Sequence, residues 1–341
     1  MQLRTFNHVG IHAVSSALPE HIVDQSEFAK MYGEQEVQRI CMNTGIHSKR
    51  VVKDFKTSQL MHSACESLFD SQDIKAKDID ALITVSQSPD SWSPGVGYQL
   101  HQKLGLNEGC SIFDLSAGCA GYITALIQAC ALITSGGYKN VIVCTGDVTS
   151  KLLDEKDRHV AMLFGDGATA SLLTEDVCSM SFMIASNGQG SDTLGTRLSY
   201  TDMGVQVHDL HMDGAEVMNF ALARVPALVR SIMSDVEITT DSLDMLVFHQ
   251  ANAFMLNYLR RMLKLEESQV PIDINGIGNT SSSSIPIVLS RNERVGTEHA
   301  KNAILCGFGV GLSWGAVVVD LSNTLRIPPV IALESEAKST A

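Results

Sequence analysis

A chain of 341 residues is long enough to bury a large core, either as one domain or as two fused halves. Its formal net charge of -13 disfavours nucleic acid as a main partner, because phosphate binding needs a basic surface. Apolar runs stay shorter than the roughly 18 residues of a transmembrane helix, so we expect no membrane insertion. The segment Met1 to Gly10 is not typical of a signal peptide, which predicts a soluble, cytoplasmic protein.

The cysteines argue against both a disulfide framework and a structural zinc site. No two of them form a CxxC pair, and the chain is long and carries no export signal, so we expect reduced core thiols and no bound metal. The eight are Cys41, Cys65, Cys110, Cys119, Cys130, Cys144, Cys178 and Cys306.

In the first half, apolar runs and glycines alternate as in an α/β protein. Residues 80–86 and 111–115 read as buried strands, and the second runs through Gly118–Gly121 into a helix that ends near residue 135. A further strand is predicted at 141–145, followed by an insertion over 149–163. Alternating strands and helices predict largely parallel sheets covered by helices.

The second half repeats this order after a predicted loop over residues 186–213. Strands are expected at 244–249, 271–275 and 303–306, and the middle one runs into Gly278–Thr280 and a helix to about residue 290. The offset between matching elements is roughly 160 residues, which favours an internal duplication over chance alternation. We therefore divide the chain into an N-terminal half, 1–180, and a C-terminal half, 181–341, whose tail from about residue 328 is expected to fray.

Cys119 is the cysteine with the clearest chemical potential. It lies between a predicted strand and the start of a helix, where free N–H groups and positive potential stabilise a thiolate. Such a thiolate is a competent nucleophile toward a thioester. The alternative is a small buried cysteine in a tight turn.

His249 and Asn279 occupy positions that could complete a site around Cys119. His249 ends a predicted strand, where α/β folds place ligands, and Asn279 holds in the second half the position that Cys119 holds in the first. Taken alone, a histidine is more often a satisfied core or surface residue. If the halves pack about a pseudo-twofold axis, the three meet. The cysteine would then hold an acyl group, while the histidine and asparagine donate hydrogen bonds to the carbonyl of a second thioester.

The segment from Gly307 to Gly315 is glycine-rich and separates two predicted strands. It is either a flexible connection or a loop that aims a backbone N–H at the acyl carbonyl, forming an oxyanion hole with the N–H of Cys119. No Lys-Ser or Lys-Thr follows it, so it lacks the context of a phosphate-binding loop.

Four segments together resemble the signatures of the β-ketoacyl-acyl carrier protein synthase III family, in the order Cys, His, Asn. They are Asp114–Tyr122, Phe248–Asn252, Gly278–Pro286 and Gly307–Gly315. The resemblance extends from about residue 5 to residue 320. It implies a five-layered αβαβα thiolase fold of two duplicated halves, a homodimer, and Cys119, His249 and Asn279 as catalytic residues.

The same resemblance implies a reaction and its substrates. Cys119 would be acylated by acyl-coenzyme A or acyl carrier protein. A malonyl thioester, on coenzyme A or carrier protein, would then lose carbon dioxide with the help of His249 and Asn279, and its carbanion would attack the acyl-cysteine to give a 3-oxoacyl thioester. No metal or bound redox cofactor is implied.

Several positions depart from the family pattern. Arg158 matches the arginine that sandwiches the adenine of coenzyme A, whereas Arg39 stands where the family carries the opposing tryptophan; an arginine can still stack on a base. Val310 replaces the central glycine of the last loop and would supply its N–H to the oxyanion hole. Asn252 and Phe308 are expected to bind substrate.

Two further groups follow from the resemblance. Trp92 and Ser93 lie in the loop expected to close the acyl pocket across the dimer. An arginine that helps carrier-protein docking in the family is replaced near Phe254, which shifts the expected docking site to Arg260, Arg261 and Lys264; the alternative for this cluster is an ordinary solvated helix face.

These departures favour a specialised pathway, such as that of a secondary metabolite, signal or unusual lipid, over the initiation of fatty-acid synthesis. Three hypotheses stay open: a decarboxylative condensing enzyme, a non-condensing acyltransferase of the same fold that acts on an alcohol or amine, and a non-catalytic partner subunit. The presence of all three catalytic residue types counts against the last.

Overall fold

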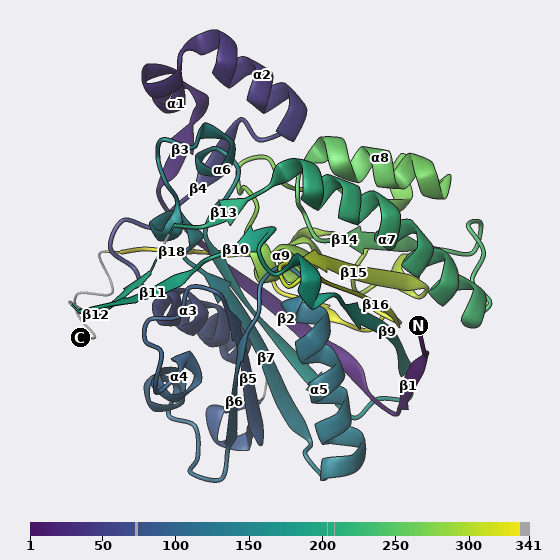
Figure 1. The fold of residues 1–341 in the computed structure, drawn as a ribbon. Helices are drawn as coiled ribbons and strands as arrows, with labels where there is room; N and C mark the ends of the chain where they lie inside the picture. Colours follow the sequence, from purple (N-terminus) through teal and green to yellow (C-terminus); the bar gives the residue numbers. More distant parts are fainter. Residues whose placement is uncertain (72–73, 203, 208, 335–341) are drawn as a thin grey trace.

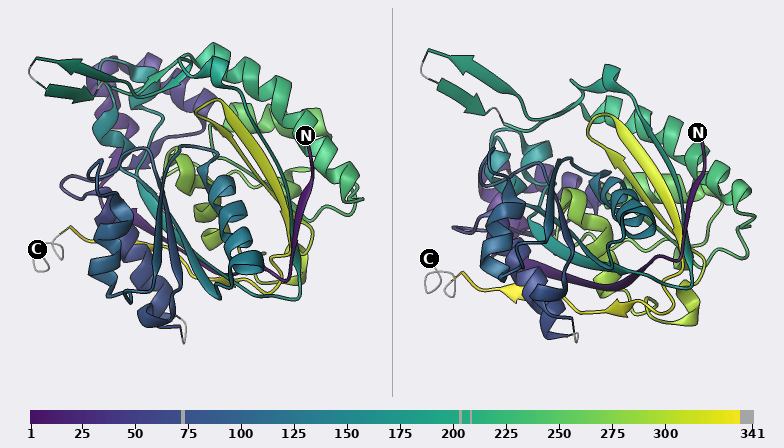
Figure 2. Two further views of the ribbon diagram at one scale, coloured as in Figure 1. Left: turned by 60° about the horizontal axis from the view of Figure 1, so that its bottom comes forward. Right: turned by 90° about the horizontal axis from the view of Figure 1, so that it is seen from below.

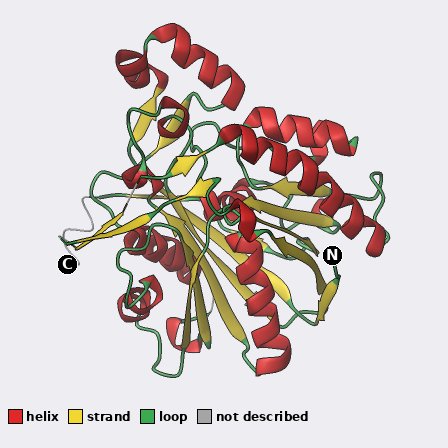
Figure 3. Cartoon of the chain, viewed as in Figure 1, coloured by secondary structure: helices red, strands yellow, loops and turns green. Residues whose placement is uncertain are grey.

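The computed structural model describes residues 1–71, 74–202, 204–207 and 209–334. Two β-sheets lie face to face with helices between them, and further helices cover the outer face of each sheet (Figures 1 and 3). The result is the five-layered αβαβα arrangement that the family resemblance implied.

The first sheet is built mainly by the N-terminal half. Its strand order is β17-β2-β8-β7-β5-β6, and β18 also pairs with β2. The outer face is covered by α3 (Thr57–Asp70) and α4 (Val96–Leu104). The strands are β2 (Gly10–Pro19), β5 (Ala81–Ser86), β6 (Ser111–Ser116), β7 (Asn140–Asp147), β8 (Gly167–Thr174), β17 (Leu325–Arg326) and β18 (Val330–Ala332). Since β5 lies between β7 and β6 and is covered on both faces, all six of its residues are buried, which explains its mostly apolar sequence.

The second sheet has the order β1-β9-β16-β15-β14. Its outer face packs on α7 (Gly214–Asp235) and α8 (Ala253–Leu263). The strands are β1 (Arg4–Asn7), β9 (Ser179–Ser186), β14 (Met245–Phe248), β15 (Ala303–Gly309) and β16 (Ser313–Val319). Parallel pairing of β14 with β15 brings the carboxyl end of β14 beside Cys306.

Two helices, α5 (Gly121–Gly136) and α9 (Ser284–Arg291), form the central layer. Their apolar residues pack against both sheets in one continuous core cluster, which is why α5 has apolar or small residues around most of its circumference. A short 3-10 turn, Ser281–Ser283, precedes α9. Cys119 and Asn279 therefore sit just before the two helices of the central layer.

The strand orders reveal the internal duplication. The succession β2-β8-β7-β5 in the first sheet corresponds to β9-β16-β15-β14 in the second. The ends of the chain cross over, because β1 joins the second sheet while β17 and β18 join the first. The expectation of a frayed tail from about residue 328 is therefore wrong for Val330–Ala332, which pairs in parallel with β2. The division at residue 180, which falls inside β9, stays a prediction.

The counterpart of β6 in the second half, predicted at residues 271–275, is not a strand. The carboxamide of Gln250 contacts this segment instead: its Oε1 accepts the N–H of Asp273 at 2.9 Å, and its Nε2 donates to the carbonyl of Pro271 at 3.4 Å. Hydrogen bonds from one side chain thus replace the backbone pairing that a sixth strand would make. As a result, β14 is the edge strand of its sheet.

The predicted loop over 186–213 contains two small antiparallel pairs. One joins β10 (Leu194–Gly195) to β13 (His211–Met212), and the other joins β11 (Leu198–Thr201) to β12 (Gly204–Val207). The β11–β12 hairpin extends away from the rest of the molecule (Figure 2).

A small cap lies beyond one end of the sheets, at the top of Figure 1. It contains the pair β3 (Ile22–Asp24) and β4 (Ser48–Arg50) and the helices α1 (Gln25–Tyr32), α2 (Glu34–Thr44) and α6 (Arg158–Ala161). Within the described residues, every helix is too short or too polar to cross a membrane.

Candidate active site

Cys119 lies in the tight connection between β6 and α5. The N–H of Gly121 donates to the carbonyl of Gly118 at 2.7 Å, which turns the chain from strand to helix within a few residues. The side chain is only 4% exposed. No side chain caps the start of α5, whose N-cap residue is Ala120, directly after Cys119.

His249 follows β14 directly and is buried. Its backbone N–H donates to Cys306 at 2.8 Å, which continues the pairing with β15 and fixes the residue at the strand end. In the side chain, Nδ1 lies 2.7 Å from Oγ of Ser284. Burial lowers the pKa of His249 to about 3, with a small opposing effect from the carbonyl of Ser281, so the imidazole is neutral near pH 7.

Asn279 is fixed by its backbone. Its N–H donates to Leu163 at 2.9 Å and its carbonyl accepts from Gly165 at 3.1 Å. In the side chain, Oδ1 accepts the N–H of Ser281 at 2.9 Å. Because the carbonyl oxygen of the amide is engaged in this way, Nδ2 is the group that Asn279 can offer to a ligand.

The three side chains meet at one small cavity of about 70 Å³, although they lie far apart in the sequence. Phe308 and Asn252, both expected to bind substrate, also line it. The Phe308 ring contacts the His249 ring edge-on at 5.6 Å between centroids. Asn252 caps α8 through Oδ1, which accepts the N–H of Met255 at 2.8 Å.

Two serines complete this centre. Oγ of Ser281 lies 3.9 Å from Sγ of Cys119, and Oγ of Ser284 contacts His249. Ser281 adopts a φ of 53°, an unusual backbone conformation for a residue with a side chain. The sequence analysis did not identify either residue. The run of four serines after Asn279 was the available signal, but serine alone does not indicate which hydroxyl faces a site.

The electrostatics of the site keep both Cys119 and His249 uncharged. Burial raises the pKa of the Cys119 thiol to about 11, with hydrogen bonds from Ser281 and the Val310 backbone opposing the shift. The buried Asp147 adds a smaller rise in the same direction. The N-terminus of α5 stabilises the thiolate and acts against burial. A neutral thiol beside a neutral imidazole is therefore the resting state.

The glycine-rich loop approaches Cys119 closely. A Cβ at Gly309 would stand 2.9 Å from Sγ of Cys119, and the Val310 backbone lies within hydrogen-bonding reach of that sulfur. The Val310 side chain turns to the opposite side, where its Cγ2 would lie 2.8 Å from a Cβ at Gly118. The proposed oxyanion donors, the N–H groups of Cys119 and Val310, therefore belong to adjoining segments.

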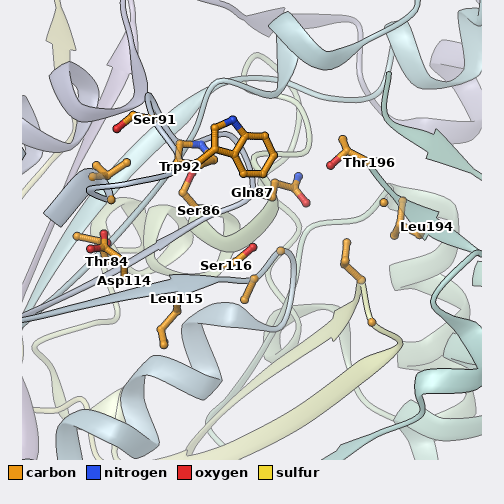
Figure 4. A pocket seen from close by; sticks show the side chains of 18 of the residues that line it. Thr84, Ser86, Gln87, Ser91, Trp92, Asp114, Leu115, Ser116, Leu194 and Thr196 are labelled. Atoms are coloured by element: carbon orange, nitrogen blue, oxygen red, sulfur yellow. The ribbon is translucent and has the colours of Figure 1, made fainter. Parts of the chain in front are cut away.

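Gly118 and Val310 line a second, larger cavity of about 400 Å³. Figure 4 shows this cavity from close by. It shares Leu194 with the small cavity. Trp92 lines it with 67% of its surface exposed. Ser93, the other residue expected there, is not part of this lining.

Arg39 and Arg158 lie together, but outside both cavities. Nη2 of Arg39 is 2.6 Å and Nε of Arg158 is 2.7 Å from the same oxygen of Glu36. Hydrogen bonds first from Arg39 and then from Arg158 lower the pKa of Glu36 to about 2. The two arginines expected to hold adenine are thus bridged by a carboxylate that the sequence analysis did not identify.

The basic cluster on α8 divides in two. Arg261 and Lys264 are exposed, whereas the Arg260 side chain is 14% exposed and is held by the carbonyl of Leu265 and by Glu267. The Arg260 side chain is therefore mostly buried, whereas a docking residue was expected to be exposed.

Two other expectations concern metals and thiols. Among the residues that the structure describes, no group of three or more His, Cys, Asp or Glu side chains is arranged to hold a metal ion. All eight cysteines are free thiols; Cys178 is half-buried and the others are buried.

The chain matches known proteins over nearly its whole length. Residues 113–192 match the family described as 3-oxoacyl-(acyl-carrier-protein) synthase III, and residues 233–321 match its C-terminal domain. The beta-ketoacyl-(acyl-carrier-protein) synthase III of Geobacillus kaustophilus is 32% identical over 312 residues, 91% of this chain and 98% of that protein. Synthase III 1 of Bacillus cereus is 33% identical over 317 residues, with 92% and 98% covered.

Solved structures agree with this assignment. The 3-oxoacyl-(acyl-carrier protein) synthase of Burkholderia xenovorans superposes with a TM-score of 0.90 at 30% identity, covering 97% of this chain and 99% of that one. The priming β-ketosynthase of the R1128 polyketide biosynthetic pathway gives 0.85 at 27% identity, with 96% and 99% covered. The chain therefore belongs to the β-ketoacyl-acyl carrier protein synthase III family of thiolase-fold acyltransferases.

Proposed function

We propose that this enzyme joins an acyl group to the two-carbon unit of a malonyl thioester by decarboxylative Claisen condensation, with Cys119, His249 and Asn279 as its catalytic residues. The observation that carries the proposal is the meeting of these three side chains at one buried cavity. A thiol nucleophile and two neutral hydrogen-bonding groups are what the two half-reactions require.

In the first half-reaction, Sγ of Cys119 attacks the carbonyl carbon of an acyl thioester. The thiol proton leaves the sulfur during the attack and passes to the departing carrier thiolate. The N–H groups of Cys119 and Val310 stabilise the oxyanion. The tetrahedral intermediate collapses by breaking the bond to the carrier thiol, which departs with the proton and leaves acyl-Cys119.

In the second half-reaction, a malonyl thioester enters the cavity. His249 and Nδ2 of Asn279 donate hydrogen bonds to its thioester oxygen as the bond to the carboxylate breaks and carbon dioxide leaves. The electron pair of that bond forms an enolate. Its carbon attacks the carbonyl carbon of acyl-Cys119, and the carbon–sulfur bond breaks to give the 3-oxoacyl thioester and free Cys119.

The exposed face of α8 is the proposed docking site for the carrier protein. Phe254 and Tyr258 are 52% and 43% exposed and lie one helical turn apart, and Arg261 follows on the same face. An exposed apolar pair beside basic groups suits an acidic, amphipathic helix of a partner. Arg261 and Lys264 keep the docking role expected for them, and Arg260 does not.

The edge strand β6 supports a homodimer. It lies at the edge of the first sheet, so one row of its backbone N–H and C=O groups lacks a neighbouring strand in the described chain. Pairing of two copies along this edge would be isologous and would bury the half-exposed Phe113 and Leu115. The cytoplasmic location and the specialised pathway stay predictions.

Intact-protein mass after incubation with acyl-coenzyme A and acyl carrier protein donors tests the first half-reaction. We expect the mass of one acyl group, absent in Cys119→Ala and present in Cys130→Ala, which removes another buried cysteine from the neighbouring helix. Malonyl thioester is then added and carbon dioxide is measured.

Release of carbon dioxide with formation of a 3-oxoacyl product supports condensation. Transfer of the acyl group to an alcohol or amine without carbon dioxide would identify the non-condensing alternative. A Cys119→Ala variant that is still acylated would overturn the assignment of the nucleophile.

A further inference from the structure

The 400 Å³ cavity beside Cys119 has the volume of a small-molecule site. It reaches the nucleophile through Gly118, the residue before Cys119, and through Val310 and Leu194. An acyl chain on Cys119 that turns past Gly118 would enter it. Part of its lining is apolar, but many of its side chains are neutral and polar (Figure 4).

Several polar groups at the periphery of the cavity are already engaged. Thr84 donates to Asp114 at 2.5 Å, Ser86 donates to Asp147 at 3.1 Å, and Ser91 donates to the carbonyl of Pro94 at 2.6 Å. These groups fix the walls and are poorly placed to recognise a ligand.

Three polar side chains in the lining differ from these. In the described part of the chain, the half-buried carboxamide of Gln87 and the exposed hydroxyls of Ser116 and Thr196 make no hydrogen bond to the protein, and all three face the cavity (Figure 4). Gln87 is held at its backbone, whose N–H donates to Asp147 at 2.8 Å. Its Oε1 would stand 2.7 Å from a Cβ at Gly118. The carboxamide therefore lies against Gly118, the residue before Cys119.

We infer that this cavity selects an uncharged acyl group that carries a hydroxyl or keto oxygen within its first few carbons, and that Gln87 is the residue that recognises this oxygen. The inference rests on the proposed acylation of Cys119 and adds the substrate class. An alkyl chain would cover the carboxamide of Gln87 without replacing its hydrogen bonds to water, which disfavours simple fatty acyl groups.

The charges that one chain contributes to the lining disfavour a second class of substrate. Neither lysine nor arginine lines the cavity in the described chain, and Asp114 contributes a carboxylate. A dicarboxylic acyl group would bring a second negative charge into this wall without a cation to pair with it. Succinyl donors are therefore expected to be poor substrates.

The test compares rates of Cys119 acylation by four thioesters of one carrier: butyryl, 3-hydroxybutyryl, 4-hydroxybutyryl and succinyl. We expect at least one hydroxybutyryl donor to react about tenfold or more faster than butyryl, and succinyl to be slowest. Gln87→Leu removes the carboxamide at similar volume. It should slow the preferred hydroxybutyryl donor by about 10- to 100-fold and leave butyryl unchanged or faster.

Gln102→Leu is the matched control, because Gln102 is exposed on α4 and lies outside both cavities. It should leave all four rates unchanged. Equal rates for butyryl and both hydroxybutyryl donors, or a preference that Gln87→Leu does not alter, would overturn the inference and leave the proposed function intact. Absence of an adduct from every donor would instead overturn the proposed nucleophile, and this inference with it.

Discussion

Oγ of Ser284 lies 2.7 Å from Nδ1 of His249, at the start of the helix that also follows Asn279. The same oxygen accepts the backbone N–H of Gln250 at 3.2 Å. That N–H occupies one lone pair of the hydroxyl, and in the tautomer that the proposed condensation requires, the hydroxyl donates its proton to Nδ1. This arrangement leaves the ring proton of the neutral His249 on Nε2, where it can serve a substrate carbonyl. Ser284 is thus a positioning residue for His249.

Replacement of Ser284 by alanine should slow the second half-reaction more than the first. Loss of the hydroxyl frees the ring to rotate and to change tautomer, so donation to the malonyl carbonyl weakens. We expect the rate of carbon dioxide release to fall roughly ten- to hundredfold, with Cys119 acylation within about threefold of the parent enzyme. The two rates are measured separately, by carbon dioxide release and by intact mass.

Ser290→Ala provides the control for this variant. Ser290 is a buried serine of the same helix, bonded to Ser16 and to the carbonyl of Ile287, and it lies outside the cavities. It should lower the thermal stability without separating the two rates. An equal loss of both half-reactions in Ser284→Ala would count against a positioning role.

The pH dependence of Cys119 reactivity follows from the raised pKa of its thiol. The thiolate is the nucleophile, and burial raises the pKa to about 11. Below that pH, the thiolate fraction grows with rising pH, so alkylation by iodoacetamide should accelerate about tenfold per pH unit across the neutral and mildly alkaline range. Peptide mass mapping of residue 119 isolates this cysteine. A plateau near neutral pH would indicate a Cys119–His249 ion pair instead.

The meeting of Cys119, His249 and Asn279 at one cavity could be predicted from the sequence because these residues mark local features. Cys119 follows a strand and precedes a helix, His249 ends a strand, and Asn279 precedes the second helix of the central layer. Such positions are visible in hydrophobic periodicity and glycine placement. The order of the strands then brings them together, and this order follows from the duplication.

The supporting groups could not be predicted in the same way. Glu36 meets Arg158 across 122 positions of sequence, and Gln87 reaches the site only because β5 pairs with β6. The segment 271–275 has an apolar pattern typical of a strand, yet the Gln250 carboxamide takes the place of its ladder. Hydrogen bonds made by one side chain, such as that of Gln250, do not repeat along the chain, so hydrophobic periodicity cannot reveal them.

Glu36 should control the affinity for coenzyme A donors. Its carboxylate occupies both Arg39 and Arg158, and it brings negative charge to a place where a coenzyme A phosphate would need positive charge. Glu36→Gln should strengthen binding of acyl-coenzyme A by roughly three- to tenfold at low salt, with a smaller gain at high salt. Calorimetric titration measures this change.

Glu34→Gln is the matched control for that titration. Glu34 lies in the same helix, and neither arginine is bonded to it in the described structure. Glu34→Gln removes one negative charge, as Glu36→Gln does, but it breaks no contact of Arg39 or Arg158. If both variants bound acyl-coenzyme A more tightly by the same factor, the effect of Glu36 would come from net charge alone and not from its contacts with the two arginines.

Gly309 should tolerate no side chain, because the glycine-rich loop lies directly against the nucleophile. Its φ is 152°, and an added Cβ would stand 2.7 Å from Cβ and 2.9 Å from Sγ of Cys119. Gly309→Ala must displace either the loop or the cysteine, and strain and overpacking each cost about 1–3 kcal/mol. We expect acylation to fall about a hundredfold or more, together with a lower melting temperature.

Gly188→Ala is the control, because a Cβ there meets no atom within 4 Å. Acylation at the parent rate in Gly309→Ala would mean that the Val310 N–H is not held against Cys119, and the oxyanion hole would then need another donor.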